Sequence, residues 1–357
     1  MSDDLKKIRK LIDMLDTKIL KSLNQRGVLA QKIKKAKDSS DNKSLYRPER
    51  ETQILKKLER LNEGPLSKQH IQSIYKEIIS ACLSLEIKLS ISCLGPEESY
   101  SSIALNKFFG SSVKKNYTKT LADIFYNVKN QTVDYGVVPI ENSNQGSVRE
   151  ALQHLIASEV KICGEVNLNI KHCLLSTCNN ISSIKKVYAH EQTFLQCDAW
   201  LNKNLPNIKR NILSSNSAAA KKVSNLKDSA AIASRSCSKL YNLTILRNNI
   251  NDNVDNTTRF IVIGSQFVNS SGFDKTSILI TVPNKSGALN NVLKYLSDSN
   301  ISMTKIESIP TKINNWEYMF MLDIDGHIDD KIVKRSLEKI KNNCVFFMHL
   351  GSYPKSI

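Results

Sequence analysis

Among the cations along the first long apolar pattern of the chain, the spacing of Arg9, Arg26 and Lys37 could serve chemistry. Arg26 and Lys37 are 11 residues apart, close to three helical turns, so they share one face with backbones about 16 Å apart. Long basic side chains at this spacing can converge on a small carboxylate-bearing molecule. Arg9 precedes Arg26 by 17 residues, about 25 Å of helix, so it reaches the same molecule only from an antiparallel second copy. The alternative interpretation is a solvated cationic face.

Hydroxyl and amide side chains gather farther along the chain, where strand-like runs give way to helix-like ones. These strings occupy residues 95–101, 138–143, 190–193, 214–219 and 256–260. Hydroxyls, amides and backbone N–H groups at such junctions bind carboxylates well. Each string by itself is also typical of an ordinary turn or helix N-cap, so only the set indicates a site.

The first 90 residues predict three helices that position the cations. Apolar residues recur at helical spacing over 3–37, with no Gly or Pro before Gly27. Pro48 fits the first turn of a second helix that ends near residue 62, and Gly64 and Pro65 break the pattern. The third helix is expected over 67–89.

From residue 91 onward, short strands alternate with helices, which predicts a wound α/β unit. We expect strands at 91–94, 113–117, 135–140, 187–189, 230–233 and 259–263. The expected helices cover 100–109, 121–129, 193–202 and 217–223. Residues 266–274 are small and polar, as in a linker.

The last segment has the element order βαββαβ, which is ferredoxin-like. Strands are expected at 276–282, 301–309, 316–324 and 345–350, and helices at 287–299 and 329–341.

Composition bounds the class of protein. The chain has 357 residues, of which 41% are hydrophobic and 24% charged, so it is globular and long enough for two or three domains. The net charge is +17, which by itself also fits a nucleic-acid binder whose affinity would fall steeply with salt. Residues 1–90 carry 20 basic and 12 acidic residues, so +8, and the rest carry the other +9. No basic tail or recognition motif accompanies the charge, so we predict no nucleic-acid partner.

Other classes are excluded by missing patterns. No apolar run reaches about 18 residues and the N-terminus lacks a signal-peptide core, so we expect a cytoplasmic chain that does not meet the membrane. The eight Cys and six His show no metal-binding spacing, and no glycine-rich nucleotide loop occurs. We therefore expect neither a metal nor a cofactor.

With these patterns in place, residues 5–90 resemble the all-α chorismate mutase domain. The positions that match its motifs are Arg9, Arg26, Lys37, Arg47, Arg50, Glu51, Cys82 and Glu86. Arg47 stands where some members have Asp, and Cys82 stands where some have Ser.

The resemblance to the mutase domain implies a role for each matched position. Arg26 and Arg9 of the partner subunit hold the two carboxylates of chorismate by bidentate pairs. Lys37 and a protonated Glu86 act as catalytic donors to the ether oxygen, where charge develops. Glu51 accepts from the ring hydroxyl, and Arg47 and Cys82 complete the binding site. A homodimer or higher homo-oligomer follows, because the site is shared.

Residues 91–265 resemble prephenate dehydratase. The Gly95-Pro96 opening, the string Pro-Ile-Glu-Asn-Ser at 139–143 and the triplet Thr-Arg-Phe at 258–260 carry the likeness. The resemblance implies two α/β lobes with a cleft between them and Thr258 as the catalytic residue. It implies prephenate binding by Glu141, Asn142, Ser143 and Arg259. Glu98 stands where the family usually has Gly.

The C-terminal segment resembles an ACT regulatory domain, whose usual effector is phenylalanine. Its effector strings match Gly287-Ala288-Leu289, Glu307-Ser308 and residues 316–320. The second string is usually Glu-Ser-Arg-Pro, but Ile309 replaces the Arg here. Because Ile offers none of the five donors of Arg, we expect weak or absent feedback. The alternative is that Ile309 faces an apolar neighbour and nothing changes.

The resemblances predict one multidomain enzyme. We expect a mutase domain at 1–90, a dehydratase domain at 91–266 and an ACT domain at 276–353. The substrates are chorismate and prephenate, on the path to phenylalanine. The alternative from another class is a ligand-sensing regulator that has lost catalysis, because solute binders also use two lobes. The presence of Arg26, Lys37 and Thr258 favours the enzyme.

Overall fold

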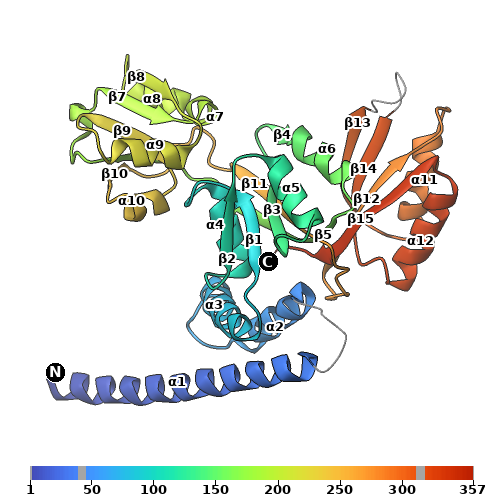
Figure 1. Ribbon diagram of the computed structural model, residues 1–357, viewed down its shortest axis with the longest axis horizontal. Helices are drawn as coiled ribbons and strands as arrows, with labels where there is room; N and C mark the ends of the chain where they lie inside the picture. The colour runs from blue at the N-terminus through green and yellow to red at the C-terminus, as the bar shows by residue number, and fades with distance from the viewer. Residues whose placement is uncertain (1, 39–45, 311–317, 357) are drawn as a thin grey trace. The chain divides into compact units, whose positions relative to one another are not determined.

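The computed structural model describes residues 2–38, 46–310 and 318–356, without the side chains of Ser2, Lys37 and Asp38. Two compact units divide the chain. The first holds residues 1–90 together with 109–114, and the second holds residues 91–108 and 115–357. The three parts expected from the sequence can be followed along the chain in Figure 1.

The helical unit consists of three helices with recognisable ends. They are α1 (Ser2–Asp38), α2 (Pro48–Leu61) and α3 (Lys68–Glu86). Pro48 occupies the first turn of α2, where its missing N–H costs nothing. Ser67 caps α3 by accepting from the backbone N–H of His70. Both α1 and α2 pack against α3.

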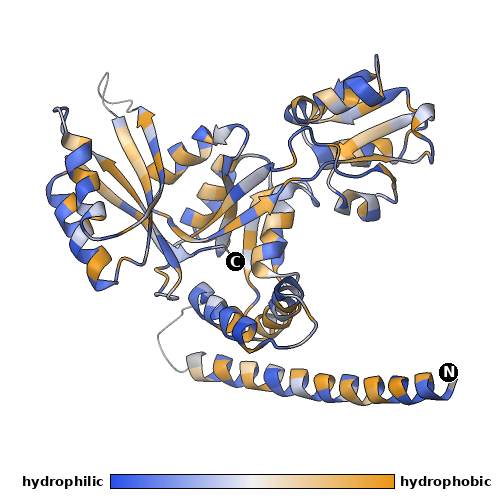
Figure 2. Ribbon diagram, turned by 180° about the vertical axis from the view of Figure 1, so that it is seen from behind, coloured by the Kyte–Doolittle hydropathy of each residue, from blue (hydrophilic) through white to orange (hydrophobic). Residues whose placement is uncertain are grey.

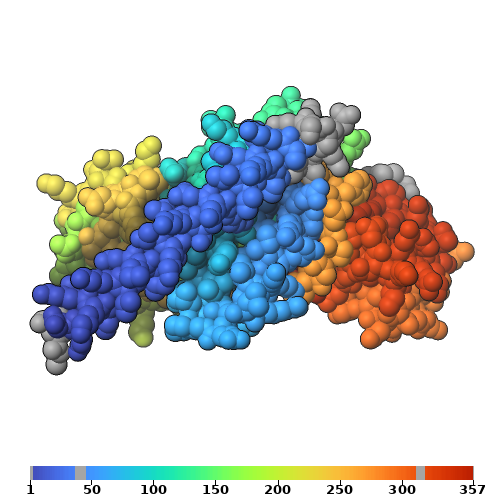
Figure 3. All heavy atoms as spheres, turned by 90° about the horizontal axis from the view of Figure 1, so that it is seen from below, coloured from blue at the N-terminus to red at the C-terminus, as the bar shows by residue number. Residues whose placement is uncertain are grey.

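The N-terminal half of α1 has no apolar partner within the described residues. Every described side chain from residue 3 to residue 22 is exposed. An apolar row runs along this half with 51–59% of each side chain exposed, namely Leu5, Ile8, Leu11, Ile12, Leu15 and Ile19. Figure 2 shows these apolar segments recurring along α1, and Figure 3 shows the uncovered outer face of the helix. A narrow apolar row of this kind is typical of a helix that packs on another helix.

The first sheet of the second unit has the strand order β2-β1-β3-β11-β5, with the short β4 paired to β3. Its strands are β1 (Ser90–Leu94), β2 (Lys114–Thr118), β3 (Tyr135–Asn142), β4 (Gly146–Ser147), β5 (Lys161–Asn169) and β11 (Thr257–Gly264). The helices within this stretch are α4 (Tyr100–Phe109), α5 (Leu121–Lys129) and α6 (Arg149–Ala157). Strand β1 runs parallel to β3, whereas β11 runs antiparallel to both β3 and β5.

The second sheet lies in the other lobe and has the order β10-β6-β9-β7-β8. Its strands are β6 (Cys173–Ser176), β7 (Lys186–Ala189), β8 (Lys209–Ile212), β9 (Ser229–Ala233) and β10 (Thr244–Arg247). Its helices are α7 (Glu191–Gln196), α8 (Asp198–Asn204), α9 (Asn216–Val223) and α10 (Ser236–Leu240), with a 3₁₀ turn at Ile181–Ser183. The chain crosses between the lobes twice, once after β5 and once before β11.

The third sheet has the order β13-β14-β12-β15. Its strands are β12 (Asp274–Thr281), β13 (Met303–Pro310), β14 (Tyr318–Asp325) and β15 (Phe346–Pro354), with helices α11 (Ala288–Ser297) and α12 (Lys331–Asn342). The chain order is therefore βαββαβ. Residues 316 and 317, which belong to the third expected effector string, lie outside the described residues.

The two faces of the third sheet serve different cores, because successive side chains of a strand point to opposite faces. Ile278 and Ile280 pack against α11 and α12. Leu279, Met321 and Tyr353 instead belong to the core of the first sheet. One buried apolar core therefore joins the third sheet to the first.

Several elements differ from the sequence-based expectations. Helix α6 and strands β5, β6, β8 and β10 were not expected at all, and the expected helix at 193–202 is split into α7 and α8. Strand β5 contains polar residues such as Glu165 and Asn167, which broke its apolar pattern, although Glu165 is buried by an ion pair. Among the helices of the described residues, none combines the length and apolarity that crossing a membrane requires.

The close approach of β15 to β5 depends on Gly351. A Cβ atom at this position would overlap the backbone oxygen of Ile162. We predict that Gly351→Ala lowers the free energy of unfolding of the second unit by about 1–3 kcal/mol, because overpacking forces the two strands apart. Chemical denaturation followed by fluorescence measures the change.

The control for this prediction is Gly64→Ala. Gly64 has an ordinary φ, and its nearest neighbour would lie 3.8 Å from the new Cβ. This variant should remain within about 0.5 kcal/mol of the parent. Equal stability of the two variants would contradict the argument.

Candidate functional site

The central strand β11 places the expected catalytic residue Thr258 at a cleft. Thr258 lies opposite Asn142 of β3 on one side and opposite Leu168 of β5 on the other. Because strand side chains alternate, Thr258 and Phe260 line the cleft, whereas Arg259 points to the opposite face of the sheet.

The cleft has a volume of about 690 Å³ and is lined from both lobes. The first lobe contributes Pro139, Asn142 and Thr258, and the second contributes His190, Gln196 and Asn216. A space of this size suits a small molecule. The strings that the sequence singled out therefore meet at one place.

The Thr258 hydroxyl has a defined hydrogen-bonding role. Asn142 Nδ2 donates to Thr258 Oγ1 over 2.8 Å, and it also donates to Asn256 Oδ1 over 2.8 Å. The orientation of the Asn142 amide is fixed, because its Oδ1 accepts from the backbone N–H of Asn144 over 3.0 Å. Since Thr258 Oγ1 accepts from Asn142, its own proton is available for another acceptor.

A hydrogen-bonded relay of Tyr100, His172 and Gln196 borders the cleft, where the chain first crosses from one lobe to the other. The ring of His172 lies 2.9 Å from the Tyr100 hydroxyl through Nδ1 and 2.9 Å from Gln196 Oε1 through Nε2. Burial lowers the pKa of His172 to about 4, and the hydrogen bond to Gln196 offsets only part of that effect. Burial also raises the pKa of Tyr100 well above its usual range. At neutral pH the relay is therefore uncharged.

Two residues expected to bind substrate, Arg259 and Glu141, are not brought to the cleft. Arg259 donates to Glu165 over 2.8 Å, to Asp323 over 2.6 Å and to the Tyr353 hydroxyl over 2.9 Å. The reason is strand alternation, which turns position 259 to the face opposite Thr258. Asp323 and Tyr353 belong to β14 and β15, so Arg259 joins β11 to the third sheet.

Glu141 lies on the same side of the sheet as Arg259. Its carboxylate is 3.7 Å from Arg259 and 3.0 Å from Lys305 of β13. Ser143 is also expected in the binding site, but its hydroxyl donates to the Asp255 carbonyl over 3.1 Å and accepts from the Thr257 N–H over 3.0 Å. Among the four expected binding residues, Asn142 is thus the one in the cleft lining.

In the helical unit, the expected mutase residues have different environments. Arg26 is half-buried and donates to the Ile78 carbonyl of α3 over 3.3 Å. Glu51 is buried, accepts from the Tyr46 hydroxyl over 2.8 Å and pairs with Lys76. Two donors of the chain itself, Tyr46 and Lys76, therefore already contact the Glu51 carboxylate. The sequence gave no signal for the contact with Lys76.

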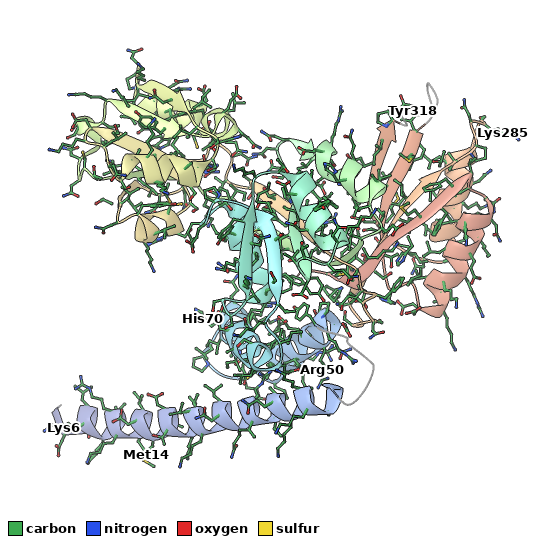
Figure 4. All side chains as sticks on the ribbon, viewed as in Figure 1. Lys6, Met14, Arg50, His70, Lys285 and Tyr318 are labelled. Carbon is green, nitrogen blue, oxygen red and sulfur yellow. The ribbon has the colours of Figure 1, made fainter. Side chains whose placement is uncertain are left out.

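The other expected mutase residues range from buried to exposed. Cys82 is buried on α3, Glu86 is half-buried at the end of α3, and Arg47 is exposed at the N-cap of α2. Arg9 is exposed on the unpartnered half of α1. Figure 4 shows Lys6 and Met14 of the same half pointing away from the helix. Lys37 lies in the last turn of α1, and its side chain is outside the part of the chain that the structure describes.

The expected effector residues lie at the start of helix α11 and on strand β13 of the third sheet. Gly287 precedes α11 with a φ of 79°, a left-handed conformation that favours glycine, and Ala288 and Leu289 form the first turn. On β13, Glu307 lies 3.1 Å from Lys305 and accepts from the hydroxyl of Ser147. Ser308 is exposed.

Ile309 packs against the apolar core that the first and third sheets share. This placement supports the alternative in which Ile309 has an apolar neighbour.

Sequence reasoning did not include Asn256, His172, Tyr100 and Gln196 among the site residues. Asn256 stands in one of the singled-out strings, but an isolated Asn is usually a turn residue. Tyr100 also stands in a singled-out string, at 95–101, whereas Gln196 gave only helical spacing and His172 gave no pattern. As for metals, the described residues bring no three His, Cys, Asp or Glu side chains into a group that could hold an ion.

Glu98 adopts an unusual backbone conformation beside the cleft. Its φ is 60°, in the left-handed region, and its carbonyl accepts from the Ser234 hydroxyl over 3.1 Å. The left-handed conformation costs a residue with a Cβ roughly 1–2 kcal/mol, whereas Gly adopts it freely. Glu98 is also one of the residues that line the cleft.

We predict that Glu98→Gly lowers the KM for an anionic substrate of the cleft several-fold and does not lower the midpoint of thermal unfolding. The substitution removes both a left-handed Cβ and a negative charge that repels carboxylates. Steady-state kinetics and thermal unfolding measure the two effects.

Glu98→Gln separates the two causes, because it removes the charge and keeps the Cβ. It should reproduce the fall in KM without the gain in stability. An unchanged KM in both variants would show that the Glu98 charge does not act on the substrate.

Comparisons with known proteins agree on all three parts of the chain. Family models match at residues 8–87 (chorismate mutase type II), 91–267 (prephenate dehydratase) and 276–342 (ACT domain). A bifunctional chorismate mutase/prephenate dehydratase of Stutzerimonas stutzeri is 40% identical over 100% of this chain and 99% of its own length. The protein of the same description from Aquifex aeolicus is 40% identical, covering 99% of each chain.

Solved structures resemble the second unit. Prephenate dehydratase from Arthrobacter aurescens in complex with L-Phe is 27% identical with a TM-score of 0.68, covering 74% of this chain and 90% of its own. A structure described as the quorum quenching acylase GqqA has the same TM-score of 0.68 at 24% identity, covering 75% of this chain and 98% of its own. At that identity the second likeness shows a shared fold alone.

Proposed function

Because the chain belongs to the family of bifunctional chorismate mutase/prephenate dehydratases, we propose that its helical unit rearranges chorismate to prephenate and its cleft converts prephenate to phenylpyruvate. The single observation that supports the second reaction best is the Thr258 hydroxyl. It accepts from Asn142 and keeps its own proton for an acceptor in the cleft. A protein that only senses a ligand has no need of such a donor.

The dehydratase reaction needs orientation and one well-placed donor. The bond from the ring to its carboxylate breaks, and that electron pair enters the ring as carbon dioxide leaves. The ring bond to the hydroxyl then breaks, the oxygen leaves with its electron pair, and a proton converts it to water. Formation of the aromatic ring provides the driving force. Thr258 is too weak an acid to give up its proton unaided, so it stabilises the leaving oxygen by a directed hydrogen bond.

The mutase reaction is a concerted rearrangement that requires no nucleophile. We infer that Arg26 and Arg9 of the partner subunit bind the two carboxylates of chorismate. Lys37 and Glu86 donate to the ether oxygen as its bond to carbon breaks. Glu51 accepts from the ring hydroxyl, once the substrate competes with Tyr46 and Lys76. The exposed apolar row of α1 supports the dimer that this site requires.

The ACT domain of the family implies regulation by phenylalanine. We infer that the effector uses Gly287, Ala288, Leu289, Glu307 and Ser308. In the unliganded chain Glu307 already has Lys305 and Ser147 as partners. The ammonium of an amino acid must compete with Lys305 for that carboxylate, which weakens feedback. Ser147 also lines the cleft, so displacement of Glu307 would reach the active site.

We predict that Thr258→Ala separates the two activities. Phenylpyruvate formation should fall by roughly 10²–10⁴-fold, the range for a lost acid–base group. Prephenate should still accumulate from chorismate at the parent rate. A coupled assay that starts from chorismate and follows both products measures this.

The control for the separation is Thr257→Ala, next to Thr258 and absent from the cleft lining. It should keep phenylpyruvate formation near the parent rate. Joint loss of both activities in a folded Thr258→Ala chain would contradict the division of labour.

The mutase site is predicted to need two chains. Arg9→Ala and Arg26→Ala should each abolish mutase activity, because each removes a partner of a substrate carboxylate. The two positions are 17 residues apart, about 25 Å of helix, so the two arginines of one site come from different chains. Mixed and exchanged chains should regain up to about a quarter of the parent mutase activity, since at most half of the molecules are heterodimers and each has one intact site. Mixing that restores nothing would rule out the shared site.

Feedback is predicted to strengthen when Lys305 is neutralised. Lys305→Gln removes the competing cation from Glu307, so phenylalanine should inhibit the dehydratase at a concentration about tenfold lower, equivalent to about 1.4 kcal/mol. Lys294→Gln on the exposed side of α11 is the matched control and should leave inhibition unchanged. Equal inhibition curves for both variants would remove Lys305 from this role.

A further inference from the structure

Asn256 is buried beside the catalytic hydroxyl and has no role in the proposed function so far. Its side chain is fully buried, and its Oδ1 accepts from Asn142 Nδ2 over 2.8 Å. Its backbone carbonyl accepts from the Ile170 N–H over 2.7 Å, which ties one crossing between the lobes to the other. Asn256 itself does not line the cleft.

The amide nitrogen of Asn256 is a buried donor without a partner among the described residues. Leaving such a group unpaired costs about 1–3 kcal/mol, and unpaired buried groups are rare enough to need an explanation. A residue retained for stability alone would not carry this cost. The side chain therefore has a use that offsets it.

The geometry of Asn142 supplies that use. Its Nδ2 has two protons, and its two short contacts, each of 2.8 Å, are to Asn256 Oδ1 and Thr258 Oγ1, with a longer contact of 3.5 Å to the Thr257 carbonyl. The Asn144 N–H holds Oδ1 from the opposite side. With both ends of the amide held, the second proton has a single direction, and Thr258 Oγ1 must act as an acceptor from Asn142.

We propose that Asn256 is a positioning residue of the dehydratase, which acts through Asn142 to keep the Thr258 hydroxyl proton directed at the departing oxygen of the substrate. The inference rests on the proposed function of the cleft. Without the Asn256 acceptor, the Asn142 amide can turn and donate to substrate or water. The Thr258 hydroxyl can then donate its hydrogen bond to Asn142 Oδ1, and the leaving oxygen of the substrate loses its donor.

The first test compares Asn256→Ala with Asn256→Asp, using prephenate as substrate. Asn256→Ala removes the acceptor, so kcat should fall about 10–100-fold with KM within about threefold, as for an interaction made mainly in the transition state. Asn256→Asp keeps an acceptor for Asn142, so kcat should stay within about threefold. Its negative charge should raise KM for the dianionic substrate instead.

Stability provides a readout that a structural role would not give. Asn256→Ala removes one unpaired buried donor and leaves one Asn142 N–H without its acceptor, so the two effects largely offset and the midpoint of thermal unfolding should stay close to the parent value while kcat falls. Mutase activity of the same chains, which belongs to the other unit, serves as the internal control. A fall in stability in proportion to kcat would overturn the proposal.

A double-mutant cycle tests whether Asn256 acts through Asn142. In an Asn142→Ala background, adding Asn256→Ala should change kcat less than twofold, because the connecting amide is already gone. Equal losses in both backgrounds would overturn the proposal, and so would an unchanged kcat in Asn256→Ala. An increase in KM alone would assign Asn256 to substrate binding instead. If the parent chain forms no phenylpyruvate from prephenate, the proposed function itself fails.

Discussion

The insertion of β11 between β3 and β5 is the constraint on which the second unit depends. This strand returns from the second lobe and pairs antiparallel with two strands of the first. Its register brings Thr258 opposite Asn142, although 116 residues separate them. Because a strand has a period of two residues, the same register sends Arg259 to the other face. One pairing therefore builds the cleft on one side and the joint to the third sheet on the other.

The joint between the first and third sheets is a buried network of charged side chains that come from distant parts of the chain. Arg259 is about nine-tenths buried with Asp323, Glu165 and the Tyr353 hydroxyl around it. Burial raises the pKa of Tyr353 well above its usual range, and Asp323 adds to the effect. Lys275 pairs with Glu165 over 2.9 Å and completes the compensation. A buried pair of this kind is costly to break on one side, so the network fixes the orientation of β11 relative to β14 and β15.

The helical unit shows the opposite situation, an apolar surface that its own chain leaves uncovered. Residues 3–22 of α1 are exposed although an apolar row runs through them. Burying the row would contribute roughly 25 cal/mol per Å² of apolar surface removed from water. A second copy of the same helix is complementary to it by symmetry. In the dimer that we propose for the mutase site, burial of this row would accompany the approach of the partner subunit's Arg9 to Arg26.

The sequence by itself determined what depends on local pattern. Apolar periodicity indicated the three N-terminal helices, and the order βαββαβ of the last segment was visible in its runs. The family resemblances predicted Thr258 and Asn142, which the structure brings within 2.8 Å. These features could be predicted because helices, turns and motif strings are specified by residues close together in the chain.

Tertiary structure alone decided what depends on partners distant in the chain. Strand β5 was not expected because its Glu165 is buried through ion pairs with Arg259 and Lys275, which lie 94 and 110 residues away. Arg259 of β11 and Glu141 of β3 were expected at the substrate, but side-chain alternation in the two paired strands directs both toward the third sheet. Asn256 and His172 form their hydrogen bonds with residues distant in the chain. A residue's type states what it can donate or accept, but pairing between strands fixes the direction in which it does so, and that pairing is not local.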